Sequence, residues 1–256
     1  MPDWRPAEYL AFANERARPA LDLISRIPVR DPKIVCDLGC GPGNSTALLR
    51  AAFPGARITG ADNSPAMLSQ ARAALPEARF IEADVASFVP QPEADLIFAN
   101  AVFQWVPDHP SVLARLLAGL RPGGVLAVQM PDNLGEPSHS LMQEAAEQGP
   151  WRDILKASSG ARSDILPPTG YYDLLRPLCS VLDIWHSIYN HPVQGIQGIV
   201  DFVASTGLRP YLDRLADDQR ADYLDAYKAS LAAHYPVARD GKVLFRFPRL
   251  FILAVK

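Results

Sequence analysis

Residues 34–53 read IVCDLGCGPGNSTALLRAAF, and this stretch decides the fold. An apolar run that contains Asp37 is followed by three glycines, Gly39, Gly41 and Gly43, and then by apolar residues at helical spacing. This order predicts a buried parallel strand, a tight turn and a helix. Glycine adopts positive φ and lets a ligand approach the bare main chain. We therefore expect a nucleotide-type ligand at this turn.

The spacing within the turn favours a cationic ligand over a dinucleotide. A dinucleotide motif needs a third glycine where this chain has Asn44, and Pro42 removes one amide donor that a diphosphate would use. Asp37 adds what we expect to be a fixed negative charge, which suits a cation. A nicotinamide-dependent oxidoreductase is thus the disfavoured alternative.

The turn DLGCGPGNST, residues 37–46, resembles the first motif of the class I S-adenosylmethionine-dependent methyltransferases, and RPGG at 121–124 is a second similarity. The resemblance spans about residues 33–130 and implies an α/β fold. Its expected form is a Rossmann-like, seven-stranded, mostly parallel sheet with helices on both faces and a helical lid. The two ends, WRPAEYLAFANERARPALDLI and DGKVLFRFPRLFILA, resemble the narrower family of trans-aconitate 2-methyltransferases.

The order of patterns predicts four segments. Residues 1–30 form an N-terminal helical segment that covers the site, with Pro19 expected to break it into two helices. Residues 31–131 form the S-adenosylmethionine-binding core. Residues 132–178 form a helical lid, and residues 179–256 complete the sheet with further inserted helices.

Acidic residues end the second and third predicted strands. Asp62 can accept both vicinal hydroxyls of a ribose, and Ser64 is the expected N-cap of the next helix. The resemblance assigns Asp84 to the adenine amine and the next amide, that of Val85, to the ring; a helix-capping aspartate is the alternative. Met67 is either a cofactor contact or a core methionine. The predicted cofactor-binding set is Asp37, Gly39, Gly41, Asp62, Asn63, Met67, Asp84, Val85, Asn100 and Trp105.

Methyl transfer to a carboxylate needs alignment and the exclusion of water. A carboxylate is already ionised at neutral pH, so no general base and no catalytic residue is expected. The five histidines lie outside the convergence of the first five strands: His109, His139, His186, His191 and His234. The product would be S-adenosyl-L-homocysteine.

A small polycarboxylate needs cationic and neutral hydrogen-bond donors, and the chain has 20 Arg against 5 Lys. Aromatic faces at Phe103 and Trp105 could also meet a sulfonium. Either could equally be an aromatic residue that packs a helix, although the location favours a functional role for at least one. Ordinary solvated surface charges are the alternative for the arginines. The predicted substrate-binding set is Tyr9, Arg16, Arg18, Phe103, His139, Arg152, Tyr171 and Arg246, with Arg162 and Tyr172 as further donors.

The net charge, the apolar runs and the cysteine count restrict the partners and the cellular compartment that we expect. The net charge is −3 with no basic stripe, which disfavours nucleic acid. No 18-residue apolar run or signal pattern is visible, so we expect no membrane partner and a cytoplasmic protein, as a monomer or weak dimer. The three cysteines have no zinc spacing, so reduced thiols and no metal are expected.

The leading hypothesis is the formation of the monomethyl ester of trans-aconitate. Another small carboxylic acid, an acyl-carrier-bound malonyl group or a natural-product hydroxyl are alternative acceptors. A non-catalytic S-adenosylmethionine-binding module is an alternative from another class, because a fold does not fix a function.

Overall fold

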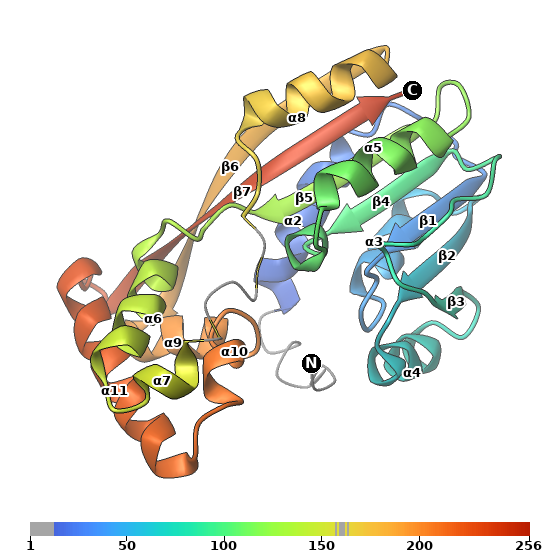
Figure 1. The fold of residues 1–256 in the computed structure, drawn as a ribbon. Coiled ribbons are helices and arrows are strands. Elements are labelled where there is room, and N and C mark those ends of the chain that lie inside the picture. Colours follow the sequence, from blue (N-terminus) through green and yellow to red (C-terminus); the bar gives the residue numbers. More distant parts are fainter. Residues whose placement is uncertain (1–12, 157, 159–161, 163) are drawn as a thin grey trace. The chain divides into compact units, whose positions relative to one another are not determined.

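The structure is a computed structural model, and it describes residues 13–156, 158, 162 and 164–256 (Figure 1). The strands are β1 Ile34–Leu38, β2 Arg57–Asp62, β3 Arg79–Glu82, β4 Leu96–Asn100, β5 Val125–Pro131, β6 Val181–Gln194 and β7 Lys242–Val255. The helices are α2 Ala13–Ser25, α3 Asn44–Ala52, α4 Pro65–Ala74, α5 His109–Gly119, α6 Pro137–Gln148, α7 Arg152–Leu155, α8 Pro168–Leu175, α9 Gly195–Ala204, α10 Arg209–Leu212 and α11 Asp217–His234. Two short 3₁₀ helices are η1 Phe103–Trp105 and η2 Arg176–Leu178.

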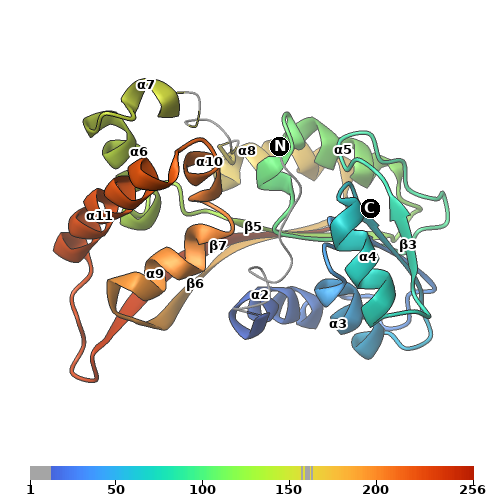
Figure 2. The ribbon, with the colours of Figure 1, turned by 90° about the horizontal axis from the view of Figure 1, so that it is seen from below.

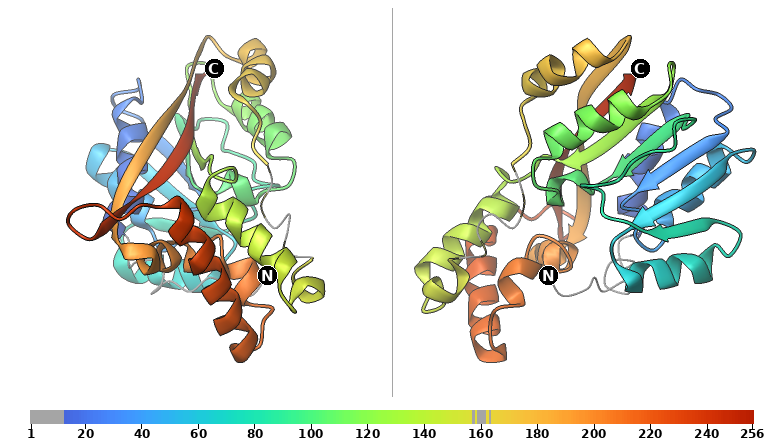
Figure 3. Two further views of the ribbon diagram at one scale, coloured as in Figure 1. Left: turned by 90° about the vertical axis from the view of Figure 1, so that its left-hand side faces the viewer. Right: turned by 45° about the vertical axis from the view of Figure 1, so that its right-hand side comes forward.

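The strands form one seven-stranded sheet in the order β3-β2-β1-β4-β5-β7-β6. The first five strands pair in parallel, and the arrow of β7 runs opposite to that of β5 (Figure 1). The two long strands β6 and β7 lie side by side in every view (Figure 3). The predicted seven-stranded, mostly parallel sheet is confirmed. Strand order reverses between β1 and β4, which is where such sheets bind ligands at their carboxyl ends.

The central strands are buried along their length, as the apolar runs require. All seven residues of β5 are buried, as are four of the five in β1 and in β4. Helices α2 and α3 pack together on one face, and α5 and α8 on the other (Figure 2). Strands covered on both faces read as continuous apolar runs, which explains the sequence pattern.

Two local predictions have opposite outcomes. Ser64 is the N-cap of α4, and its Oγ accepts a hydrogen bond from the Met67 amide at 3.2 Å. The expected break at Pro19 is wrong, because α2 continues through this residue from Ala13 to Ser25. A proline removes one helical hydrogen bond, and here the packed face of α2, with buried Ala20 and Leu23, compensates for it.

The chain divides into two compact units, each built from separate stretches. Unit 1 comprises residues 1–131, 165–187 and 250–256, and unit 2 comprises residues 132–164 and 188–249. The stretch 165–178, which the sequence places in the lid, belongs to unit 1. In unit 2, α6 packs against α11. Among the helices of the described residues, none is long and apolar enough to cross a membrane.

Candidate active site

The glycine turn lies between β1 and α3, at the switch point of the sheet. Gly39 has φ +66°, and a Cβ there would lie 2.5 Å from Val102, so no side chain fits. Gly41 has φ +54°, and a Cβ at this residue would have no atom within 4 Å. The first glycine therefore permits close packing against the segment after β4. The second leaves room for a ligand against the main chain.

The amides of the glycine-rich residues 39–43 are all used within the chain. Each N–H donates within the chain: Gly39 and Cys40 to the Ala61 carbonyl (2.8 and 3.1 Å), Gly41 to Asp62 Oδ2 (2.8 Å) and Gly43 to the Cys40 carbonyl (3.0 Å). The fifth residue, Pro42, has no N–H. Residues 39–43 therefore offer no main-chain donor to a diphosphate.

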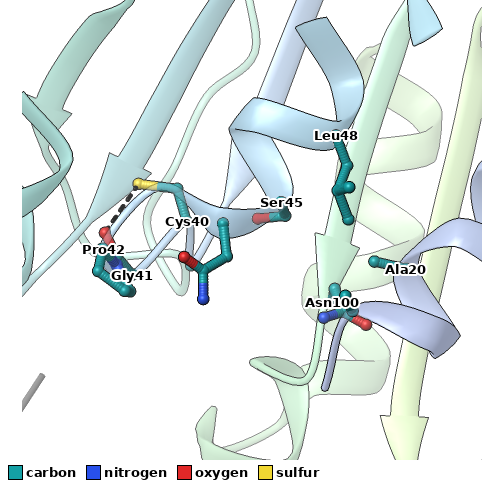
Figure 4. Close-up of a pocket in the computed structure, with 10 residues that line it drawn as sticks. Ala20, Cys40, Gly41, Pro42, Ser45, Leu48 and Asn100 are labelled. Carbon is teal, nitrogen blue, oxygen red and sulfur yellow. Dashed lines mark hydrogen bonds between the residues drawn. The ribbon is translucent and has the colours of Figure 1, made fainter. Parts of the chain in front are cut away.

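A pocket opens beside the turn and receives side chains from α2, α3 and β4 (Figure 4). Asn100, at the end of β4, has its Oδ1 buried and without a hydrogen-bond partner among the described residues. An unpaired buried acceptor is satisfied by a ligand that donates, such as an ammonium. The pocket is lined by Ala17, Ala20, Gly39, Cys40, Gly41, Pro42, Asn44, Ser45, Leu48 and Asn100.

Asp37 is fully buried beneath the turn. Its Oδ2 accepts hydrogen bonds from Ser45 Oγ (2.8 Å) and Thr46 Oγ1 (2.6 Å), while Oδ1 has no partner among the described residues. Burial raises the pKa of the Asp37 carboxyl to about 7, against the lowering effect of the two hydroxyls. The expectation of a fixed negative charge is therefore wrong. The carboxyl titrates near neutrality, and a cation bound nearby would favour its ionised form.

Asp62, the last residue of β2, connects the turn to the start of α4. Its carboxylate accepts from the Gly41 amide at 2.8 Å and from the Ser64 amide at 2.9 Å. The side chain is partly exposed, and these two bonds set its orientation before any ligand binds. A preoriented carboxylate at this position suits a pair of vicinal hydroxyls.

The segment after β3 presents a hydrogen-bond donor beside an acceptor. Asp84 Oδ1 accepts from the Ala86 amide at 2.9 Å, and the Ser87 and Phe88 amides bond back to the Asp84 and Val85 carbonyls. Among the described residues, no group accepts a hydrogen bond from the Val85 amide. An N–H next to a carboxylate complements the adenine edge, where N1 accepts and the 6-amino group donates.

The other predicted cofactor residues differ in how far they are exposed. Met67 is 3% exposed, and its amide donates to Ser64 Oγ. Asn63 is exposed next to Asp62, and Trp105 is partly buried in η1. The turn, Asp62 and the Val85 segment thus lie at the carboxyl ends of β1, β2 and β3.

The predicted substrate residues of unit 1 are only partly described by the structure. Tyr9 and the side chain of Arg16 lie outside the described residues. Arg18 is exposed on α2, and Phe103 is fully buried in the apolar core below η1.

Tyr171 is also fully buried, and its hydroxyl is used within the chain. It bonds to His109 Nε2 at 2.7 Å and accepts from the Leu166 amide at 3.2 Å. Burial lowers the pKa of His109, which favours the neutral ring. These contacts are those of a core residue that joins α8 to the start of α5.

Unit 2 contains the remaining predicted substrate residues. Arg246 on β7 forms an ion pair with Glu136, which compensates its charge. Arg152 is exposed at the start of α7. His139 on α6 is 8% exposed and belongs to a buried polar network.

The hydrogen bonds of that network allow only one assignment of donors and acceptors. Arg162 Nη1 donates to Asn133 Oδ1 at 2.9 Å, because a guanidinium can only donate. The amide of Asn133 must then donate through Nδ2 to His139 Nε2, 3.3 Å away. His139 therefore carries its proton on Nδ1, 3.0 Å from Ser138 Oγ.

The charges of the network follow from this order. Burial and the nearby Arg162 lower the pKa of His139 to about 3, so the ring is neutral. Burial also lowers the pKa of Arg162 to about 10, opposed by Asp132 and Asp164, so the guanidinium stays charged. His139 cannot serve as a cation for a carboxylate, whereas Arg162 can.

Sequence reasoning missed Asn133 and Val102. Asn133 orients Arg162 and His139 at once, and it follows β5 in a stretch without periodicity. Val102 closes on Gly39 and looks like any apolar helix residue in the sequence. Neither residue type signals these contacts in a single sequence.

Comparison with known proteins agrees with this geometry. Residues 35–124 match the family described as "Methyltransferase domain". Trans-aconitate 2-methyltransferases of Rhodopseudomonas palustris strain BisB18 and of Paracidovorax citrulli are 55% and 52% identical over 256 residues, which covers 100% and 99% of this chain and 100% and 98% of those proteins.

Solved structures show the same fold at low identity. The YcgJ protein of Bacillus subtilis has a TM-score of 0.59 at 13% identity, with 94% of this chain and 98% of that chain covered. A Haemonchus contortus phosphoethanolamine N-methyltransferase 2, solved with S-adenosyl-L-methionine, has a TM-score of 0.54 at 14% identity over 93% of this chain and 52% of that one. With relatives more than half identical over the whole length, this chain belongs to the trans-aconitate 2-methyltransferase family.

Proposed function

We propose that this chain transfers a methyl group from S-adenosyl-L-methionine to a carboxylate of trans-aconitate and releases the monomethyl ester and S-adenosyl-L-homocysteine. The relatives named for this reaction support the acceptor. The observation that carries the cofactor assignment is the buried Asp37 carboxyl beneath the turn, whose Oδ1 has no partner among the described residues.

The residues of unit 1 fit each part of this cofactor. Asp37 Oδ1 and Asn100 Oδ1 are buried acceptors without partners among the described residues, which suits a positively charged amino-acid end. Asp62 suits the ribose hydroxyls. The Asp84 carboxylate and the Val85 amide suit the adenine edge. Asn63, Met67 and Trp105 remain proposed contacts.

The chain's task in the reaction is alignment and the exclusion of water. When bound, the cofactor supplies a methyl group activated by a sulfonium. A carboxylate acceptor is ionised at neutral pH, so the protein need not remove a proton. Holding the reactants in line and removing water from the acceptor oxygen are the contributions that such a site makes.

Recognition of a polycarboxylate is assigned to charge-assisted donors. Among the residues of unit 2, Arg162 is the strongest candidate, because Asn133 holds its guanidinium in place and it remains charged. Each charge-assisted hydrogen bond to a carboxylate contributes about 1.5 to 3 kcal/mol. Substitution would also test the other predicted substrate residues, Tyr9, Arg16, Arg18, Phe103, His139, Arg152, Tyr171 and Arg246.

The direct test is turnover with a panel of acids. Purified protein is mixed with S-adenosyl-L-methionine and trans-aconitate, citrate, cis-aconitate or isocitrate, and formation of S-adenosyl-L-homocysteine is followed. We expect turnover with trans-aconitate far above the other acids. Cofactor binding without turnover on any acid would instead favour a binding module. Preference for another acid would move the assignment within carboxyl methyltransferases. The cytoplasmic location remains a prediction.

A further inference from the structure

Arg115 makes a two-armed contact with the segment that follows β3. Its Nη2 donates to the Ala86 carbonyl and its Nη1 to the Phe88 carbonyl, both at 2.6 Å. The N–H groups of a guanidinium lie in one plane at fixed positions. Two carbonyl oxygens that accept from the same guanidinium are therefore held at a fixed distance from each other. The side chain is exposed, yet both of its arms are used.

The segment needs such an anchor because it has little regular structure. Residues 83–95 join β3 to β4 without a helix or strand, and loops of this length are usually functional or mobile. Val85 is buried in the core and gives the segment one apolar anchor. Arg115 gives the turn formed by residues 84–88 a second, polar anchor through the Ala86 and Phe88 carbonyls.

Arg115 is itself carried by a rigid element. Its helix, α5, buries Val112, Leu113, Leu116 and Leu117 in the core of unit 1. The main-chain position of Arg115 is therefore set by four apolar side chains in the core. Its guanidinium then fixes the turn relative to α5 through the two hydrogen bonds.

We propose that Arg115 is a positioning residue for adenine recognition. It holds the turn at residues 84–88 so that the Val85 amide and the Asp84 carboxylate face the adenine edge together as donor and acceptor. This inference rests on the proposed assignment of Asp84 and Val85 to the adenine. It concerns the discrimination between bases and leaves the acceptor acid and the methyl transfer unchanged.

The test compares two ligands that differ only at this edge. S-adenosyl-L-homocysteine presents an acceptor at N1 and a donor at the 6-amino group. S-inosyl-L-homocysteine presents an N–H at N1 and a carbonyl at position 6, so both of its contacts oppose those of the turn. The discrimination ratio is the dissociation constant of S-inosyl-L-homocysteine divided by that of S-adenosyl-L-homocysteine, both measured by calorimetry. A high ratio means that the Asp84 carboxylate and the Val85 amide are well positioned for adenine.

We expect R115M to lower this ratio by about tenfold. A change of this size corresponds to the loss of roughly one neutral hydrogen bond to adenine. R115K should lower it less, because an ammonium reaches the carbonyls but cannot match both as a fork. The matched control is R50M, which removes a partly exposed arginine on α3 that is paired with Glu77 at 2.9 Å. R50M should leave the ratio unchanged.

Two outcomes would overturn the proposal. An unchanged ratio in R115M would show that the turn keeps its geometry without the guanidinium. Equal weakening of both ligands, together with a lower melting temperature, would assign Arg115 to general stability. R115K decides the case if R115M does not fold.

D84N separates this proposal from the one on which it rests. If D84N lowers the ratio and R115M does not, only the role of Arg115 fails. If D84N also leaves the ratio unchanged, the adenine assignment itself fails.

Discussion

Asp37 gives the sharpest test of the site, through the pH dependence of stability in Asp37→Asn. Burial raises the pKa of this carboxyl from 3.8 to about 7 in the folded protein. Between pH 3.8 and about pH 7, the folded chain therefore keeps a proton on Asp37 that the unfolded chain has lost. Stability from this group is therefore fully present below pH 3.8 and is lost as the pH rises through about 7.

The magnitude follows from the size of the shift. A change of about 3 pKa units corresponds to roughly 4 kcal/mol, lost at about 1.4 kcal/mol per pH unit across the window. Asparagine keeps an acceptor for Ser45 and Thr46 but places an amide nitrogen where Oδ1 has no partner, at a cost of about 1 to 3 kcal/mol. Above pH 7 the variant should be more stable than the wild type by about 1 to 3 kcal/mol. Below about pH 4.5 it should be less stable, because the loss in the wild type equals the cost of asparagine between about pH 4.5 and pH 6.

The assay is urea unfolding of both proteins without cofactor, from about pH 4 to pH 8. The difference between their free energies of unfolding isolates Asp37, because the other carboxylates are common to both. The difference should change sign within this range. Parallel curves would refute the reasoning, since they would mean that Asp37 is ionised throughout. In the wild type, binding of S-adenosyl-L-methionine at pH 6 should also release close to one proton, which calorimetry in two buffers detects.

Three further substitutions test other parts of the structure. Gly39→Ala places a methyl group 2.5 Å from Val102 at positive φ, so it should destabilise the protein by about 2 to 4 kcal/mol in thermal unfolding and weaken cofactor binding; an unchanged melting temperature would contradict the packing described for the turn. Tyr171→Phe removes the hydroxyl that bonds to buried His109 and should cost about 1 to 3 kcal/mol of stability with kcat nearly unchanged, whereas a large rise in KM for the acid would make this tyrosine a substrate contact. Arg162→Lys keeps a positive charge but loses the fork, so KM for trans-aconitate should rise about tenfold while the cofactor affinity stays the same; unaltered steady-state kinetics would exclude Arg162 as the carboxylate donor.

The sequence predicts the core of this protein well because its patterns are local. The apolar run before Gly39 has to form a buried strand, and acids at the ends of strands, such as Asp62, meet at one edge of a parallel sheet. The N-cap at Ser64 is equally local, since it depends on residues only three apart. These features need no knowledge of distant contacts.

The features that the sequence did not predict depend on contacts between distant residues. Arg115 contacts a turn that lies 27 to 29 positions earlier, and nothing in the helix pattern marks it. The pKa of Asp37 depends on how completely the sheet and α3 bury it. Pro19 remains helical because tertiary packing overrides its local preference.

The division of unit 1 into three stretches has a consequence for how the protein is made. Strand β5 has β7 as its outer neighbour, and residues 250–256 of β7 belong to the same unit as β5. A ribosome must therefore synthesise residues 132–249 after β5 before this edge of the sheet can be covered. During that interval the hydrogen-bonding edge of β5 is open to other chains, and unpaired edges of this kind promote aggregation. The yield of folded protein should thus depend on translation speed and on chaperones that shield the nascent sheet.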